Sequence, residues 1–145
     1  ELLADTDLQP GTYDQIRLMV NSVAVKTKAG ATKVAKLPSN QVLINSNLVV
    51  TEEMTSSVNL DFLADKSLHT TTDGEYIFAP VVKTETRSSS EVTITASGVV
   101  DINGGNVDDT KTVGMDVDGS MKTNFQLKSG QKLDINSENV IELDL

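Results

Sequence analysis

Short runs in which apolar and polar residues alternate recur along the whole chain. Ile16, Leu18 and Val20 form one such run. Side chains of a β-strand point alternately to the two faces of a sheet, so a period of two is typical of strands with one buried face. Further runs begin near residues 23, 42, 48, 58, 76, 92, 113, 125, 133 and 141. The pattern predicts a chain built almost entirely of β-strands.

Turn-forming residues separate these runs. Pro10-Gly11, Asp73-Gly74 and Asp118-Gly119 are examples, and Asn103-Gly104-Gly105 is another. Many short strands divided by such turns favour an antiparallel sandwich or barrel over a parallel α/β sheet. Residues 61–67 are compatible with a single helical turn, and we expect no longer helix.

Composition excludes several classes of function. The chain has 145 residues and no cysteine, which excludes thiolate metal sites and cysteine nucleophiles. Its formal net charge is −9 and its 12 Lys and Arg residues are scattered, so we expect neither nucleic acid nor an anionic membrane as a partner. No apolar run approaches the ~20 residues of a membrane span. Because the sequence opens on Glu1, we expect a processed chain or a fragment.

Four motifs in the first part of the chain resemble those of a known family. Residues 8–18 (LQPGTYDQIRL) resemble its L-x-x-G-x-Y-x-x-I-R-L motif, and residues 37–39 (LPS) resemble its L-x-x-P-S motif. Residues 61–67 (DFLADKS) and 74–81 (GEYIFAPV) follow in the expected order, with Leu63 where the family usually has Asp. The chain thus resembles domain-of-unknown-function family 4382 over residues 1–87, whereas residues 88–145 match no family motif.

The resemblance implies a secreted or cell-surface protein of archaea or bacteria. It implies an extracytoplasmic antiparallel β-sandwich, immunoglobulin-like or transthyretin-like, and no particular activity. Members usually begin with further strands, which this sequence lacks, so we expect part of the sheet to borrow a strand. We therefore predict a β-sandwich region over 1–87 and a β-rich region over 88–145, joined at the Ser-rich residues 86–90.

The sequence offers no convincing catalytic group. His69 is the single histidine, and Ser67 and Asp73 are only its neighbours along a Thr-rich segment, where we expect the histidine to be solvated. The carboxylate pair Glu52-Glu53 lacks the aromatic wall that a glycosidase cleft needs. We therefore predict that the protein is not an enzyme.

One acidic stretch could bind calcium. Asp101, Asn103, Asn106, Asp108 and Asp109 offer oxygen ligands in what reads as a glycine-containing loop. Calcium prefers six to eight such oxygens. The same residue types also form ordinary hairpin turns, so that alternative stays open. The acidic turn at residues 116–119 could contribute ligands to the same site.

Two classes of function remain. The first is a structural protein that associates with itself, as a homo-oligomer or a filament. In this hypothesis the alternating run Val140–Leu145 is donated as a strand to the open sheet edge of a neighbouring copy. The second is a surface module that binds calcium or carbohydrate. An aromatic content of 3% without tryptophan counts against carbohydrate, because sugar rings stack on aromatic side chains.

Overall fold

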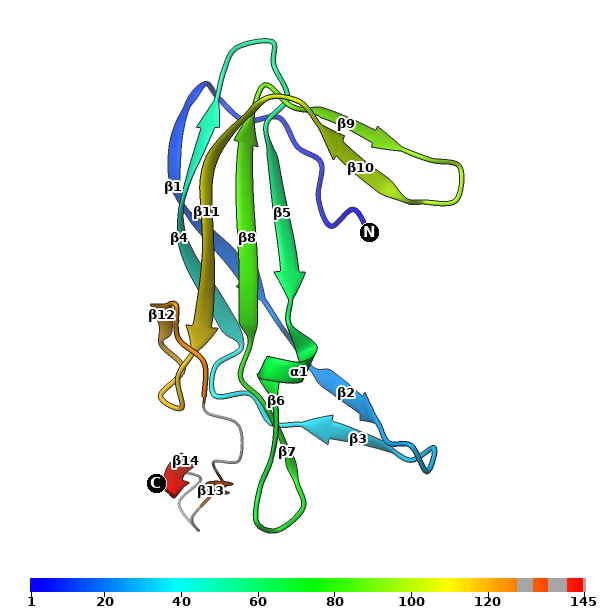
Figure 1. Cartoon of the computed structure of the whole chain (residues 1–145), viewed down its shortest axis with the longest axis vertical. Helices are drawn as coiled ribbons and strands as arrows, with labels where there is room; N and C mark the ends of the chain where they lie inside the picture. Colours follow the sequence, from blue (N-terminus) through cyan, green and yellow to red (C-terminus); the bar gives the residue numbers. More distant parts are fainter. Residues whose placement is uncertain (128–131, 136–140, 145) are drawn as a thin grey trace. The chain divides into compact units, whose positions relative to one another are not determined.

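The computed structural model describes residues 1–127, 132–135 and 141–144. Figure 1 shows strands joined by turns and a single short helix, α1, at Ala64–Ser67. The strands are β1 Gly11–Met19, β2 Val23–Lys26, β3 Thr32–Ala35, β4 Gln41–Val50, β5 Ser57–Phe62, β6 Leu68–Thr70, β7 Tyr76–Phe78, β8 Val81–Ser88, β9 Glu91–Ile94, β10 Val100–Asn103, β11 Asn106–Met115, β12 Met121–Thr123, β13 Lys132–Ile135 and β14 Ile141–Asp144. The predicted helical turn is confirmed.

Two sheets and four small ribbons make up the fold. One sheet has four strands in the order β12-β11-β8-β5, and β1 pairs with β4 in another. The ribbons are β2–β3, β6–β7, β9–β10 and β13–β14, each an antiparallel pair. The prediction of an all-β, antiparallel sandwich is confirmed. Among the residues described, no helix is long and apolar enough to cross a membrane.

The chain divides into two compact units. Unit 1 comprises Glu1–Ile16, Asn45–Leu60 and Thr84–Lys111, and unit 2 comprises Arg17–Ile44, Asp61–Lys83 and Thr112–Leu145. The predicted boundary between residues 87 and 88 lies at the end of β8, and it stays a prediction.

Unit 2 has an apolar interior. Val42 and Ile44 of β4 are fully buried, as is Val82 of β8, and Val113 and Met115 of β11 are almost as deeply buried. Burial of each such side chain contributes roughly 1.5–3 kcal/mol to the free energy of folding. The alternation found in the sequence therefore marks the inward faces of these strands.

Hydroxyl side chains dominate the interior of unit 1. Thr84, Thr86, Ser88 and Ser90 are buried, and so is Ser46 of β4. Each hydroxyl is hydrogen-bonded: Thr84 donates to the carbonyl of Lys111 and Thr86 to that of Asn47. A buried hydroxyl without a partner is costly, so these bonds are what make a polar interior tolerable. The Ser-rich residues 86–90, predicted to form a joint, thus belong to the end of β8 and the turn after it.

The structure corrects several details of the sequence prediction. The short strands β3, β6 and β12 were not predicted, because strands of three or four residues show little alternation. Phe125 and Leu127, predicted to lie in a strand, follow a turn in which Asn124 has a φ of 54°, and neither belongs to a strand. Leu127 is nevertheless buried, so its apolar character reflects burial without strand pairing.

Candidate functional site

The residues predicted to bind calcium lie in strands and not in a loop. Asp101 and Asn103 belong to β10, whereas Asn106, Asp108 and Asp109 belong to β11. The turn between these strands is Gly104-Gly105, whose φ values of 64° and 68° suit glycine. The prediction of a single ligand loop is therefore wrong, because only Gly104 and Gly105 lie outside a strand and the predicted ligands lie in β10 and β11 on either side.

Asp108 and Asp109 accept hydrogen bonds from protein groups on neighbouring strands. The Asp108 carboxylate accepts from the Ser88 hydroxyl at 2.9 Å and from the backbone N–H of Val49 at 3.4 Å. The Asp109 carboxylate accepts from the Ser46 hydroxyl and from the backbone N–H of Asn47, both at 3.2 Å. These two carboxylates bind the backbone and side chains of β4 and β8.

Lys111 completes the surroundings of Asp109, with its Nζ 2.8 Å from a carboxylate oxygen. Burial by itself would raise the pKa of Asp109. The Lys111 ammonium, the Ser46 hydroxyl and the Asn47 N–H outweigh that effect and hold the pKa below its usual value. The carboxylate is therefore ionised at neutral pH. A calcium ion bound there would have to displace or share the partners of this group.

Asp101 and Asn103 occupy the polar face of the β9–β10 ribbon. Their side chains lie on the same face of β10, and the Asn103 amide donates to the Asp101 carboxylate at 3.0 Å. Both residues are exposed. Among the described residues, no group of three or more His, Cys, Asp or Glu side chains is placed to hold a metal ion. The hypothesis of calcium binding stays a prediction.

The second acidic turn is held by its own hydrogen bonds. The Asp118 carboxylate accepts from the backbone N–H of Ser120 at 2.8 Å and from its hydroxyl at 2.6 Å. Asp116 forms an ion pair with Lys122. These contacts stabilise the hairpin between β11 and β12.

Neither Ser67 nor His69 is exposed: Ser67 is buried and His69 is half-buried. His69 lies in β6 opposite Ile77, half-buried, and its Nε2 is buried without a hydrogen-bond partner among the described residues. The prediction that it is solvated is wrong, because pairing with β7 draws the ring inward. The Ser67 hydroxyl donates to the carbonyl of Leu63 at 2.7 Å and accepts from the N–H of Val81 at 2.9 Å. It is therefore a structural hydroxyl.

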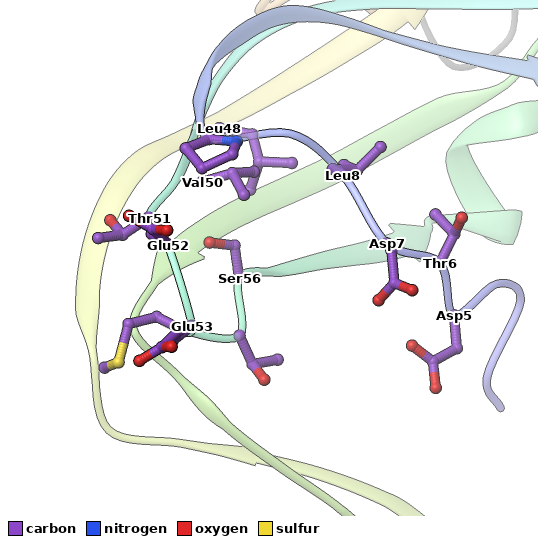
Figure 2. Close-up of a pocket in the computed structure, with 13 residues that line it drawn as sticks. Asp5, Thr6, Asp7, Leu8, Leu48, Val50, Thr51, Glu52, Glu53 and Ser56 are labelled. Atoms are coloured by element: carbon purple, nitrogen blue, oxygen red, sulfur yellow. The ribbon is translucent and has the colours of Figure 1, made fainter.

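A cavity in unit 1 was not predicted. It has a volume of about 450 Å³ and is lined by the N-terminal residues 5–8 and Pro10, by Leu48 and Val50 of β4, and by the loop 51–56. Figure 2 shows Asp5 and Asp7 on the N-terminal segment and Glu53 on the loop around one hollow. We call this cavity the acidic pocket.

Hydrogen bonds hold the two walls of the acidic pocket in place. The Tyr13 hydroxyl donates to the carbonyl of Gln9 at 2.9 Å and so fixes the N-terminal wall. In the loop, the Ser56 hydroxyl donates to the carbonyl of Val49 at 2.6 Å. The backbone N–H of Ser90 donates to the carbonyl of Thr55 at 2.9 Å. The pocket walls are thus held by two contacts that are local in sequence and by one from the more distant Ser90.

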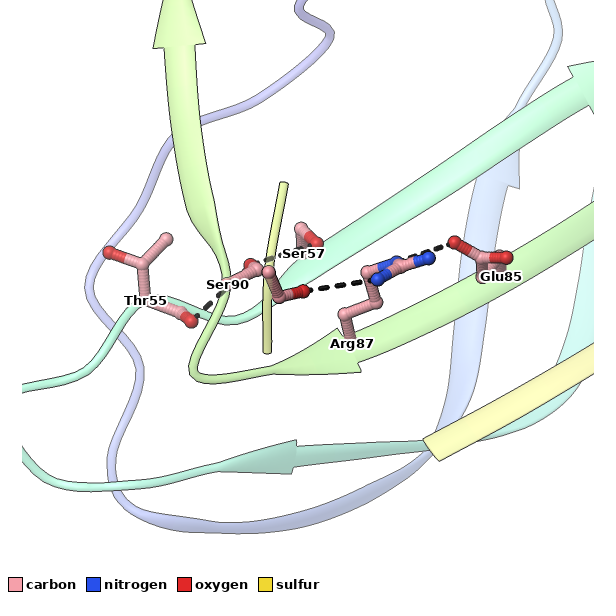
Figure 3. A network of polar contacts seen from close by, with 6 residues as sticks. Thr55, Ser57, Glu85, Arg87 and Ser90 are labelled. Carbon is pink, nitrogen blue, oxygen red and sulfur yellow. Dashed lines mark hydrogen bonds and ion pairs between the residues drawn. The ribbon is translucent and has the colours of Figure 1, made fainter. Parts of the chain in front are cut away.

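A polar network continues behind the loop (Figure 3). The Ser90 hydroxyl lies 3.0 Å from that of Ser57, and it also donates to the Thr55 carbonyl. Arg87 forms an ion pair with Glu85 at 2.6 Å and donates to the carbonyl of Gly104 at 3.0 Å. The bonds of Ser90 join the loop 51–56 to the turn after β8. The bond of Arg87 joins β8 to the turn after β10.

Four carboxylates line the acidic pocket, from Asp5, Asp7, Glu52 and Glu53, and the thirteen lining residues include no Lys, Arg or His. Leu8 and Met54 add apolar surface, with exposed fractions of 43% and 50%. Clustered carboxylates with apolar surface favour an occupant that is both cationic and partly apolar. The sequence signal that could have indicated the pocket is the repeated Asp before Pro10 together with Glu52-Glu53.

Residues 1–80, more than half of the chain, match a known family. A model of the family described as Domain of unknown function (DUF4382) matches residues 1–80. The chain belongs to this family. The match covers β1 to β7 and every residue that lines the acidic pocket. No curated protein and no solved structure matches the chain.

The structure also gives a role to two of the four DUF4382 sequence motifs. The Gly11-x-Tyr13 motif starts β1, and Tyr13 supplies the hydrogen bond that fixes the N-terminal wall. The motif at residues 61–67 ends in α1, whose Ser67 hydroxyl bonds the start of β8. The motif residues for which these contacts are seen therefore have structural roles.

Proposed function

We propose that this DUF4382 protein is a non-catalytic structural protein of the cell surface or extracellular space that associates with further copies of itself by strand addition. The observation that carries the proposal is the pairing and exposure of β1. Among the described strands it pairs only with β4, it is nine residues long, and most of its residues are exposed. A long edge strand is a template for another strand.

The opposite edge of this two-stranded sheet is closed by side chains. The backbone N–H groups of Asn47 and Val49 donate to the carboxylates of Asp109 and Asp108. The carbonyl of Asn47 accepts from Thr86. An incoming strand would have to displace these bonds on β4. We therefore assign the accepting edge to β1.

The donor in this proposal is the C-terminal run Val140–Leu145. Of that run, residues 141–144 form β14 and pair with β13, with Ile141 opposite Ile135, whereas Val140 and Leu145 lie outside the described residues. A two-stranded ribbon is only marginally stable by itself in water. Exchange of β14 from β13 to a neighbouring β1 is therefore energetically accessible.

Cysteine cross-linking tests this assembly directly, because the chain has no cysteine of its own. A Thr12→Cys variant is mixed with a Glu142→Cys variant under mild oxidation. We expect disulfide-linked pairs that contain one copy of each variant. A mixture of Lys83→Cys with Glu142→Cys is the control, since Lys83 is an exposed residue of a different strand.

Deletion of residues 140–145 provides the second test, read out by light scattering. We expect the full chain to form oligomers or filaments and the truncated chain to remain monomeric. An unchanged oligomeric state after the deletion would rule out this donor strand. A full chain that is monomeric at every accessible concentration would contradict the proposed self-association.

A further inference from the structure

One stretch of this acidic chain carries positive charge without any carboxylate. Residues 15–51 contain no Asp or Glu, but they contain Arg17 and four lysines, whereas the whole chain has a formal net charge of −9. Three of those lysines, Lys26, Lys28 and Lys33, belong to the hairpin formed by β2 and β3. We call residues 23–35 the basic hairpin.

The tip of the basic hairpin is narrow and well ordered by hydrogen bonds. The backbone N–H of Thr27 donates to the carbonyl of Ala31 at 2.8 Å, and that of Gly30 donates to Thr27 at 2.9 Å. The residues at the turn, Ala29, Gly30 and Ala31, have almost no side-chain bulk. A tip already fixed in one shape loses little conformational entropy when it binds.

Two lysines beside this tip are available for a partner. Lys33 donates to the carbonyl of Gly74 and lies 5.7 Å from the centre of the Tyr76 ring. Lys26 and Lys28, in contrast, are exposed, and neither takes part in an ion pair with any described residue. Val34 adds an apolar side chain that is 72% exposed.

The acidic pocket matches this hairpin in charge and in chemistry. Its lining carboxylates have no cation among the lining residues, and its apolar residues Leu8 and Met54 are exposed. A bare metal ion would leave that apolar surface uncovered. A lysine-bearing hairpin with small residues at its tip and a nearby Val34 provides both the positive charge and the apolar contact.

We propose that the basic hairpin of one copy docks into the acidic pocket of a second copy. This inference rests on the proposed self-association and adds a contact separate from strand addition. The two surfaces are different parts of the chain, so the contact is heterologous. Each copy then offers one hairpin and one pocket, and repetition of the contact builds a ring or an open chain of copies.

Charge reversal on each side tests the docking. Variant H carries Lys26→Glu and Lys28→Glu, and variant P carries Asp7→Lys and Glu52→Lys. We expect sedimentation at low salt to give a self-association constant at least about tenfold weaker for either variant alone than for the unchanged chain. A 1:1 mixture should regain association, because the reversed hairpin of H fits the reversed pocket of P and their unchanged surfaces fit each other.

Matched controls separate this contact from net charge. Lys66→Glu with Lys83→Glu repeats the charge change of variant H at exposed sites outside the hairpin. Glu91→Lys with Asp101→Lys does the same for variant P on the exposed face of β9–β10. We expect both controls to associate as the unchanged chain does. Circular dichroism verifies that all variants remain folded.

The outcomes are distinct. If H and P associate as the unchanged chain does, or if their mixture fails to regain association, the docking is overturned while the proposed self-association stands. If the unchanged chain is monomeric at low salt and high concentration, the proposed function itself fails. Loss in H and P alone, with recovery in the mixture, supports the docking, and high salt should then weaken the recovered contact.

Discussion

The carboxylate of Asp109 accepts a hydrogen bond from the backbone N–H of Asn47 at 3.2 Å, and this bond joins β11 of one sheet to β4 of the other. The carbonyl of the same Asn47 accepts from the buried hydroxyl of Thr86. Side chains therefore replace a neighbouring strand at this edge of β4. The arrangement gives Asp109 a structural role that a surface carboxylate would not have.

Replacement of Asp109 by alanine should destabilise the protein. The N–H of Asn47, the hydroxyl of Ser46 and the Lys111 ammonium would all lose their partner, and an unsatisfied donor costs about 1–3 kcal/mol. Partial exposure of the site to water places the expected loss in the lower part of that range. Urea unfolding measures it.

Asp101→Ala is the matched control for this loss. Its carboxylate is exposed and bonds only the Asn103 amide, so we expect a change within about 0.5 kcal/mol. Equal effects of the two substitutions would show that the contact with β4 contributes nothing beyond an ordinary surface carboxylate.

The calcium hypothesis predicts a ligand-dependent melting temperature. Calcium that binds only the folded chain should raise it, and a chelator should reverse the increase. Asp108→Ala combined with Asp109→Ala should remove the response, whereas Asp116→Ala with Asp118→Ala tests whether the second acidic turn contributes. Identical melting curves with calcium and with chelator would contradict calcium binding.

His69 should make stability depend on pH near neutrality. Burial lowers its pKa below the usual 6.5, with a backbone hydrogen bond to Lys66 acting in the opposite direction. The unfolded chain therefore binds a proton more readily than the folded one. Stability from the neutral ring is present above pH 6.5 and falls as the pH drops below that value.

A His69→Gln variant tests this assignment through melting temperatures between pH 8 and pH 5. We expect the variant to lose the decline seen in the unchanged chain over that interval. Asp109 gives a separate signal, because its pKa is lowered from 3.8 and its contribution is lost only in more acidic solution. If the variant shows the same decline in melting temperature as the unchanged chain, groups other than His69 cause the decline.

Gly105 should tolerate alanine less well than Gly98. Both residues have positive φ values, 68° and 79°, so alanine meets the same backbone strain at each. A Cβ at Gly105 would lie 2.3 Å from the carbonyl oxygen of Ser88, whereas one at Gly98 would contact nothing within 4 Å. We expect Gly105→Ala to lower the melting temperature clearly more than Gly98→Ala does. Equal losses would show that the turn after β10 can move away from Ser88.

The sequence by itself determined the fold class and the family. Period-two alternation reflects the geometry of any half-buried strand, so Val42 and Ile44 could be read as one buried face without knowledge of their partners. The single turn α1 was accessible as well, because it depends on residues close together in the sequence.

Only the tertiary structure decided the role of the polar residues. The sequence suggested that Thr86 and Ser88 lie in a joint between two regions. Their strand is instead central in its sheet, and their hydroxyls are buried against distant partners. Asp109 read as a calcium ligand because local spacing cannot reveal Asn47, 62 residues away. The acidic pocket likewise requires residues 5–10 to meet residues 48–56. A hydroxyl or carboxylate satisfies its hydrogen bonds equally well with water or with protein, and only the assembled sheets determine which of the two surrounds it.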